Sequence, residues 1–175
     1  MRFARLIAVA FAVTGGCLSV DISKAQSFFS TPPTKITLHN PSKTEGQRSR
    51  TTLSIALPAD AGASLRGIRL TQLTSPVPWD WSHAEPSLYV GPYALRGVGQ
   101  KGRVRLQSID QPTSLHIALD PPGQPGEQVN IVMRGINPAA GVYQWSVEFI
   151  PDGPDPLTSS GPTLRLNIYE IDPFY

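Results

Sequence analysis

Cysteine is nearly absent from this sequence of 175 residues, and the side chains of common enzyme motifs are sparse as well. The only cysteine, Cys17, lies in a leading segment that we expect to be removed, so the working protein has neither a disulfide bond nor thiol chemistry. No GxSxG, HExxH or phosphate-loop motif is present. No histidine has a second histidine or a cysteine at metal-ligand spacing, and we interpret all three as solvated surface side chains: His39, His83 and His116.

Long apolar runs are also missing, except at the start of the chain. There, two arginines precede an apolar run, and Ser23-Lys24-Ala25 places small residues three and one positions before a cut. Residues 1–25 are therefore predicted to be a cleavable signal peptide. The apolar stretch of about 15 residues is shorter than the roughly 20 needed to span a bilayer, which argues against a membrane anchor. Cys17 follows two glycines, so a lipid anchor at Cys17 stays open as an alternative.

The net positive charge of the full chain is lost when the signal peptide is removed. Its removal takes away three of the 15 basic and one of the 13 acidic residues, which leaves twelve of each. A neutral chain gives no electrostatic reason to expect nucleic acid or an anionic membrane as a partner. No apolar run of the mature chain is long enough to form a transmembrane segment.

Proline and glycine are plentiful. All 18 prolines and 13 of the 15 glycines follow residue 25, and they separate short apolar runs. Such residues break helices and form turns. Between them, apolar residues alternate with polar ones, as in the run from Tyr143 to Phe149, which is the pattern of a strand with one buried face. The same alternation predicts eight strands, which contain the runs 36–38, 53–57, 68–70, 104–106, 115–119, 129–133, 143–149 and 164–168.

These strands predict one all-β domain over residues 26–175, an antiparallel two-sheet sandwich of generally immunoglobulin-like architecture with about eight strands. Turns such as Asp120-Pro121-Pro122-Gly123 are expected to connect them. About 150 residues suffice for a core that stands without disulfide bonds.

The segment from Pro76 to Tyr93 concentrates aromatic residues in a proline-rich stretch. Flat aromatic rings beside polar groups can stack on sugars or anchor a protein interface. The alternative is that Trp79 and Trp81, two residues apart, plug the open end of the sandwich. Four basic residues follow closely, and they either extend this surface or decorate a solvated strand. The possible interaction surface therefore comprises Trp79, Trp81, Tyr89, Tyr93, Arg96, Lys101, Arg103 and Arg105.

Three acidic residues lie close together near the end of the chain: Glu148, Asp152 and Asp155. Oxygen ligands at a turn can hold calcium, but the prolines around them suit an ordinary loop and no known ligand spacing is met. We therefore assign no catalytic, cofactor-binding or metal site.

Several turn motifs occur in an order that resembles the family called domain of unknown function 2808. The resemblance extends over roughly residues 35–169 and rests on Leu57-Pro58-Ala59-Asp60-Ala61-Gly62, Leu119-Asp120-Pro121-Pro122, Pro125-Gly126, Asn137-Pro138, Gly141-Val142-Tyr143 and Pro151-Asp152-Gly153. It implies an exported protein of a photosynthetic bacterium with a Gram-negative envelope. The family brings no established activity, so no functional residue is carried over.

Three classes of function follow from these observations. The first is a non-catalytic structural or protein-interaction module of the periplasm or cell envelope, or alternatively of the extracellular space, with an envelope protein or polysaccharide as partner. The second is a carbohydrate-binding module that uses the aromatic segment 76–93. The third is an enzyme whose site is assembled from distant residues.

Overall fold

The computed structural model describes residues 26–73, 75–81, 84–97, 100–108 and 113–171, except for the side chains of a few strand residues such as Glu85 and Lys101. In this part of the chain no helix has the length and apolar character that crossing a membrane requires. The described residues form ten strands: β1 (Lys35–His39), β2 (Arg48–Ala56), β3 (Leu65–Gln72), β4 (Glu85–Val90), β5 (Gln100–Ser108), β6 (Ser114–Gly123), β7 (Gln128–Ile136), β8 (Gly141–Pro151), β9 (Ser159–Ser160) and β10 (Leu164–Ile168).

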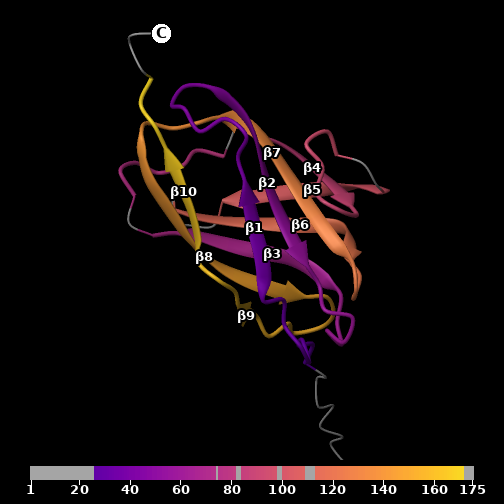
Figure 1. Ribbon diagram of the computed structural model, residues 1–175. Helices are drawn as coiled ribbons and strands as arrows, with labels where there is room; N and C mark the ends of the chain where they lie inside the picture. The colour runs from indigo at the N-terminus through magenta and orange to yellow at the C-terminus, as the bar shows by residue number, and fades with distance from the viewer. Residues whose placement is uncertain (1–25, 74, 82–83, 98–99, 109–112, 172–175) are drawn as a thin grey trace, which may run out of the picture.

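The strands follow one antiparallel path that curls into two layers (Figure 1). Their order is β1-β2-β7-β4-β5-β6-β3-β8-β10, and the short β9 also pairs with β8. The first layer contains β1, β2, β7 and β4, and the second contains β6, β3, β8, β9 and β10. Figure 1 shows β1, β2 and β7 crossing in front of β3, β5 and β6. The predicted all-β antiparallel fold is confirmed, and the two predicted sheets are continuous with each other.

Strand β5 connects the layers. Gln100–Gly102 pair with β4, whereas Arg103–Ser108 pair with β6. Gly102 stands at the crossover, where a Cβ atom would lie 2.6 Å from Leu88 Cδ2 and 2.7 Å from the carbonyl oxygen of Asp120. Both distances are too short for a real Cβ, so the close approach of the two layers requires glycine here.

The core lies between the two layers and is built from the alternating apolar residues of both. The inward side chains of β8 illustrate this, since Tyr143 and Phe149 are fully buried and Trp145 is 3% exposed. The fully buried partners on the other strands include Leu53, Ile55, Ile68, Ile117, Val129 and Ile131. Each of these residues belongs to a run that the alternation predicted to face inward.

All eight predicted strands are present, and the structure adds β4 and β9. Strand β4 lies inside the segment predicted as an aromatic loop. Its Leu88 faces the core, but Tyr89 on the opposite side is also buried, and Pro86 interrupts the apolar pattern. Because both of its faces are covered, β4 shows no alternation of apolar and polar residues.

The turn expected at Asp120-Pro121-Pro122-Gly123 lies after these four residues rather than within them. These residues form the end of β6, and the turn that leads to β7 in the other layer follows, with the Glu127 N–H donating to the Gln124 carbonyl at 3.1 Å. Pro121 and Pro122 have no partner in the ladder between Asp120 and Gly123. Proline is tolerated in a strand at positions where no backbone N–H is needed.

Candidate functional site

The aromatic segment packs its two tryptophans into the end of the core. Trp79 is 5% exposed, and its ring stacks on Trp81 with 4.8 Å between centroids. It meets Tyr143 and Trp145 of β8 edge-on, at 5.1 and 5.5 Å. Such contacts stabilise aromatic clusters beyond the apolar area that they bury. The structure thus places both tryptophans in the plug arrangement, and it leaves little of Trp79 for a ligand.

The loop of residues 75–81, here called the tryptophan loop, is held by one buried amide. The Trp79 N–H donates to Oε1 of Gln72 at 2.7 Å, and Nε2 of Gln72 donates to the Val77 carbonyl at 2.7 Å. Gln72 is itself buried at the end of β3. The loop therefore has a defined backbone position, with its tryptophans directed inward and Pro76 and Pro78 exposed.

The two tyrosines of the aromatic segment hold a second loop, the strap of residues 91–97. Tyr89 is 3% exposed, and its hydroxyl donates to the Ala94 carbonyl at 3.1 Å and accepts from the Ala94 N–H at 3.0 Å. Tyr93 lies on the strap and stacks on His39 of β1, with 3.7 Å between ring centroids. The strap therefore crosses the outer surface of the first layer, and Tyr89 is covered by it.

Polar side chains fix the strap from below. Asn130 is fully buried and donates through Nδ2 to the Gly91 carbonyl at 2.7 Å. Arg50 donates through Nη1 to the carbonyls of Ala94, at 3.2 Å, and Leu95. The Arg50 guanidinium also lies 5.9 Å from the centre of the Tyr89 ring, within the range of a cation–π contact.

Gly97 ends the strap in a conformation that favours glycine, with φ of +60°. A Cβ atom there would lie 2.7 Å from Nη2 of Arg50. The backbone of the strap is thus shaped around this arginine.

The basic residues that were grouped with the aromatics do not gather around them. Arg96 is exposed on the strap, and Arg103 and Arg105 are exposed on β5. Arg103 lies opposite Asp120 of β6, with Nε 3.9 Å from Oδ2. The side chain of Lys101 lies outside the described residues. Among the described side chains, the structure shows no contact between these arginines and the four aromatic residues of the segment.

The three carboxylates considered for calcium are engaged separately. Glu148 pairs with Arg69 at 2.7 Å, and Asp152 lies 3.8 Å from Arg66. Asp155 accepts a hydrogen bond from the side-chain amide of Gln26. Within the described ranges no three acidic, histidine or cysteine side chains are grouped as metal ligands.

Two histidines are half-buried rather than fully solvated. Burial lowers the pKa of His39, which lies under Tyr93. Burial also lowers the pKa of His116, and the positive charges of Arg69 and Arg66 lower it further. His83 lies outside the described residues.

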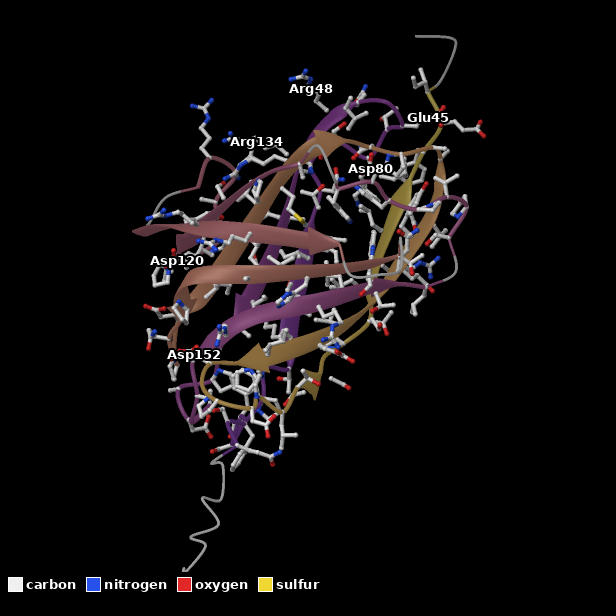
Figure 2. The ribbon with its side chains drawn as sticks, turned by 180° about the vertical axis from the view of Figure 1, so that it is seen from behind. Glu45, Arg48, Asp80, Asp120, Arg134 and Asp152 are labelled. Atoms are coloured by element: carbon white, nitrogen blue, oxygen red, sulfur yellow. The ribbon has the colours of Figure 1, made fainter. Side chains whose placement is uncertain are left out.

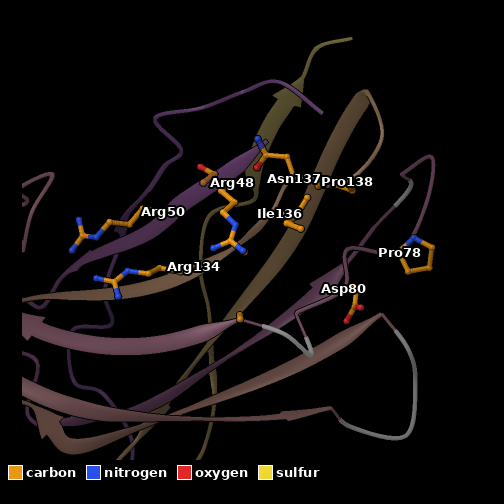
Figure 3. A pocket seen from close by; sticks show the side chains of 11 residues that line it. Arg48, Arg50, Pro78, Asp80, Arg134, Ile136, Asn137 and Pro138 are labelled. Atoms are coloured by element: carbon orange, nitrogen blue, oxygen red, sulfur yellow. The ribbon is translucent and has the colours of Figure 1, made fainter. Parts of the chain in front are cut away.

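A pocket that the sequence did not predict lies at the end of the first layer, between β2, β7 and the tryptophan loop (Figure 3). Its volume is about 680 Å³, within the range of small-molecule sites of about 300–1,000 Å³. We call it the arginine pocket, because three of the residues that line it are arginines. The lining consists of Arg48, Arg50, Arg134, Ser49, Pro78, Asp80, Ala84, Gly135, Ile136, Asn137 and Pro138.

Strand register brings the arginines together. Arg48 and Arg50 are two residues apart on β2 and share its outer face, and Arg50 stands directly opposite Arg134 of β7. Glu85 of β4 stands opposite Arg134 on its other side. Neither Arg48 nor Arg134 has a hydrogen bond or ion pair with any described residue. Two arginine side chains are therefore available to a ligand, while Arg50 supports the strap.

The other walls of the pocket are largely apolar. Figure 3 shows Pro78 and Asp80 on the tryptophan loop, across the pocket from Arg48. Ile136, at the end of β7, is 60% exposed, and Pro138 follows it.

Asn137 makes this part of the pocket rigid. It is buried, and it donates through Nδ2 to the carbonyls of Ser42 and Thr44 at 2.6 and 2.9 Å. Its Oδ1 accepts from Asn40 at 3.0 Å. The pocket is thus formed by strand ends and by two loops with buried polar anchors.

A family model matches residues 26–168, which is most of the chain. This chain belongs to the family described as Protein of unknown function (DUF2808). The match begins at Gln26 and agrees with the resemblance carried by the turn motifs. A comparison with curated proteins gives no match.

Solved structures similar to this DUF2808 member share little sequence with it. BslA, a bacterial hydrophobin, is 15% identical over 78% of this chain and 97% of its own, with a TM-score of 0.40. The C-terminal domain of the BspA polypeptide of Streptococcus agalactiae is 12% identical over 77% of this chain and 50% of its own, with a TM-score of 0.45. A protein of Nocardia farcinica with an immunoglobulin-like fold is 18% identical over 76% of this chain and 96% of its own, with a TM-score of 0.42. These likenesses carry no conclusion about the structure or function of this chain.

Proposed function

We propose that this DUF2808 protein is an exported, non-catalytic binding domain of the periplasm or cell envelope, and that the arginine pocket holds an anionic group of its partner. The observation that carries the proposal is the register of β2 and β7, which places Arg50 opposite Arg134 and leaves Arg134 and Arg48 without a carboxylate partner among the described residues. Like charges opposite each other on neighbouring strands are destabilising. A bound anion would offset this repulsion.

The chemistry of the lining supports binding rather than catalysis. An arginine stays protonated in a protein and therefore does not act as a general base. The hydroxyl of Ser49 donates to Oδ1 of the buried Asn40, an amide oxygen that does not act as a general base. The pattern of a signal peptide in residues 1–25 supports export, and we expect the mature chain to begin at Gln26.

Carbohydrate binding through the aromatic segment has less support. Stacking on a sugar needs an exposed ring face, whereas Trp79 and Tyr89 are 5% and 3% exposed and Tyr93 is stacked on His39. The aromatic residues instead hold the two loops that lie beside β2 and β7.

The proposal can be tested by cosedimentation of the purified mature domain with an envelope fraction of the cells that produce it. We expect the wild type to sediment with the envelope, and the double substitution Arg48→Gln and Arg134→Gln to remove most of this binding. Arg165→Gln is the matched control, because Arg165 is an exposed arginine on β10 outside the pocket. Equal binding of the wild type and the double variant would contradict the proposal, provided that both show the same thermal melt.

A further inference from the structure

The walls of the arginine pocket differ in a way that restricts the kind of anion it takes. On one side, Arg48 and Arg134 present guanidinium groups that have no ion pair with a described residue. On the other side, Asp80 presents a carboxylate. A ligand with negative charge all round would be attracted by the first wall and repelled by the second.

The arginine wall suits carboxylates that are spread along a chain. A guanidinium group binds a carboxylate through two parallel hydrogen bonds, so one arginine can hold one carboxylate. Arg48 lies two residues before Arg50, whose cross-strand neighbour is Arg134, so the two unpaired arginines start about 7–8 Å apart, at the diagonal spacing of a β-ladder. This spread favours successive charges of an extended polymer over one compact ion.

The opposite wall suits a sugar. Hydroxyl groups donate hydrogen bonds to carboxylates, and the carboxylate of Asp80 has two oxygens with about four acceptor positions, so it can accept from a ligand as well as from the protein. The ring of Pro78, the ring of Pro138 and the exposed side chain of Ile136 offer apolar surface to the C–H groups of a sugar ring.

We infer that the partner held in the arginine pocket is an acidic polysaccharide, with its uronate carboxylates on Arg48 and Arg134 and its hydroxyl groups toward Asp80. This inference rests on the proposed function and gives it a ligand class. A phosphate or sulfate polymer fits the arginine wall equally well, but it has less to donate to Asp80. The acidic wall is therefore the feature that selects uronate.

The test compares three polymers at physiological salt: polygalacturonate, its methyl ester and dextran sulfate. The ester keeps the sugar backbone and loses the charge, while dextran sulfate keeps a high charge without carboxylates. We expect polygalacturonate to bind, the ester not to bind, and Arg48→Gln or Arg134→Gln to weaken binding of polygalacturonate about tenfold each or more, which corresponds to the loss of a hydrogen bond to a charged group. Arg165→Gln, outside the pocket, should leave the affinity unchanged.

Asp80→Ala separates selective from unselective binding. We expect it to weaken the binding of polygalacturonate and to strengthen the binding of dextran sulfate, because it removes both an acceptor for hydroxyl groups and a repulsive charge. Equal binding of the acid and its ester, or an unchanged preference in Asp80→Ala, would overturn the inference.

The two proposals fail in different ways. If the double arginine variant no longer binds the envelope and polygalacturonate does not compete with the wild type there, the partner is another anion, and only the polysaccharide is wrong. If envelope binding does not depend on the arginines, both proposals are wrong. Protease treatment of the envelope adds a second reading, since loss of binding after digestion identifies a protein partner and overturns the polysaccharide.

Discussion

The two outer faces of this molecule differ in the charge of the side chains that lie opposite their arginines. On the second layer, charged residues that oppose each other across strands have opposite signs. Arg69 of β3 stands opposite Glu148 of β8, 2.7 Å apart, and Arg103 of β5 stands opposite Asp120 of β6, 3.9 Å apart. Figure 2 shows Asp120 and Asp152 on this part of the molecule, away from Arg48. In these two pairs, charges of opposite sign compensate each other across the sheet.

On the first layer, two arginines oppose each other. Arg50 and Arg134 are cross-strand neighbours, and Arg48 follows on the same face. Arg50 is used by the strap, whereas the other two reach the pocket without a carboxylate partner among the described residues. The comparison teaches that arginine on a strand is not by itself a sign of binding. What distinguishes the first layer is that its register places two arginines opposite each other beside a pocket, with Glu85 of β4 on the other side of Arg134.

The substitution with the largest expected effect tests whether the arginine pocket depends on the core that both layers share. Trp79→Ala removes a buried ring that contacts Trp81, Tyr143 and Trp145, so we expect a loss of about 3–5 kcal/mol in the free energy of unfolding. Urea unfolding measures it. The same variant should lose envelope binding, because Trp79 anchors the loop that forms one wall. A stable, binding-competent Trp79→Ala protein would show that the pocket does not need this anchor.

The next effect separates the two arginines that oppose each other. Arg50→Gln removes the donors to the carbonyls of Ala94 and Leu95, and we expect a loss of about 1–3 kcal/mol in the free energy of unfolding. Amide hydrogen exchange at Ala94 should become faster as the strap loosens. In the matched variant Arg134→Gln, which breaks no hydrogen bond or ion pair with a described residue, stability should stay within about 0.5 kcal/mol of the wild type. Similar losses in both variants would contradict the separate roles.

Two substitutions with smaller expected effects on stability, one on each layer, compare the layers directly. Arg69→Gln breaks the ion pair with Glu148, and because both side chains are more than a third exposed we expect a loss of only about 0.2–1 kcal/mol. Arg134→Gln should instead be close to neutral, since it relieves repulsion with Arg50 on one side and removes the positive charge opposite Glu85 on the other. Added salt should shrink the first effect by screening. The same sign for both substitutions would remove the contrast between the faces.

The smallest effect concerns pH on the second layer. The pKa of His116 is lowered from about 6.5 by burial and by Arg69 and Arg66, so the folded state binds fewer protons than the unfolded state near that pH. Stability is then fully present above the unfolded pKa and falls as the pH drops through and below about 6.5. Thermal melts between pH 8 and 5 should show this decline. His116→Gln should make it shallower, with the remainder due to His39, whose pKa is also lowered.

Local patterns were good predictors of strands and poor predictors of sites. Each run with strict alternation became a strand, and Leu164–Ile168 is an example whose apolar face is buried. Strand β4 was missed because the strap covers the outer side of Tyr89, which hides the alternation. The aromatic segment was singled out from the sequence, which left open whether its rings plug the core or bind a partner. In the structure, Trp79 and Trp81 pack against β8, more than 60 residues away in the chain.

The sequence by itself determined the antiparallel β class, the residues that fill the core and the family, because alternation and turn motifs are short-range signals. Only the tertiary structure decided that Arg48 and Arg134, 86 positions apart, share a pocket that faces Asp80. Neither arginine stands in a motif. Their proximity depends on β2 pairing with β7 in one particular register, and a slip of one residue would turn Arg134 into the core. Strand pairing is a property of the whole fold, and so is the group of arginines that it brings together.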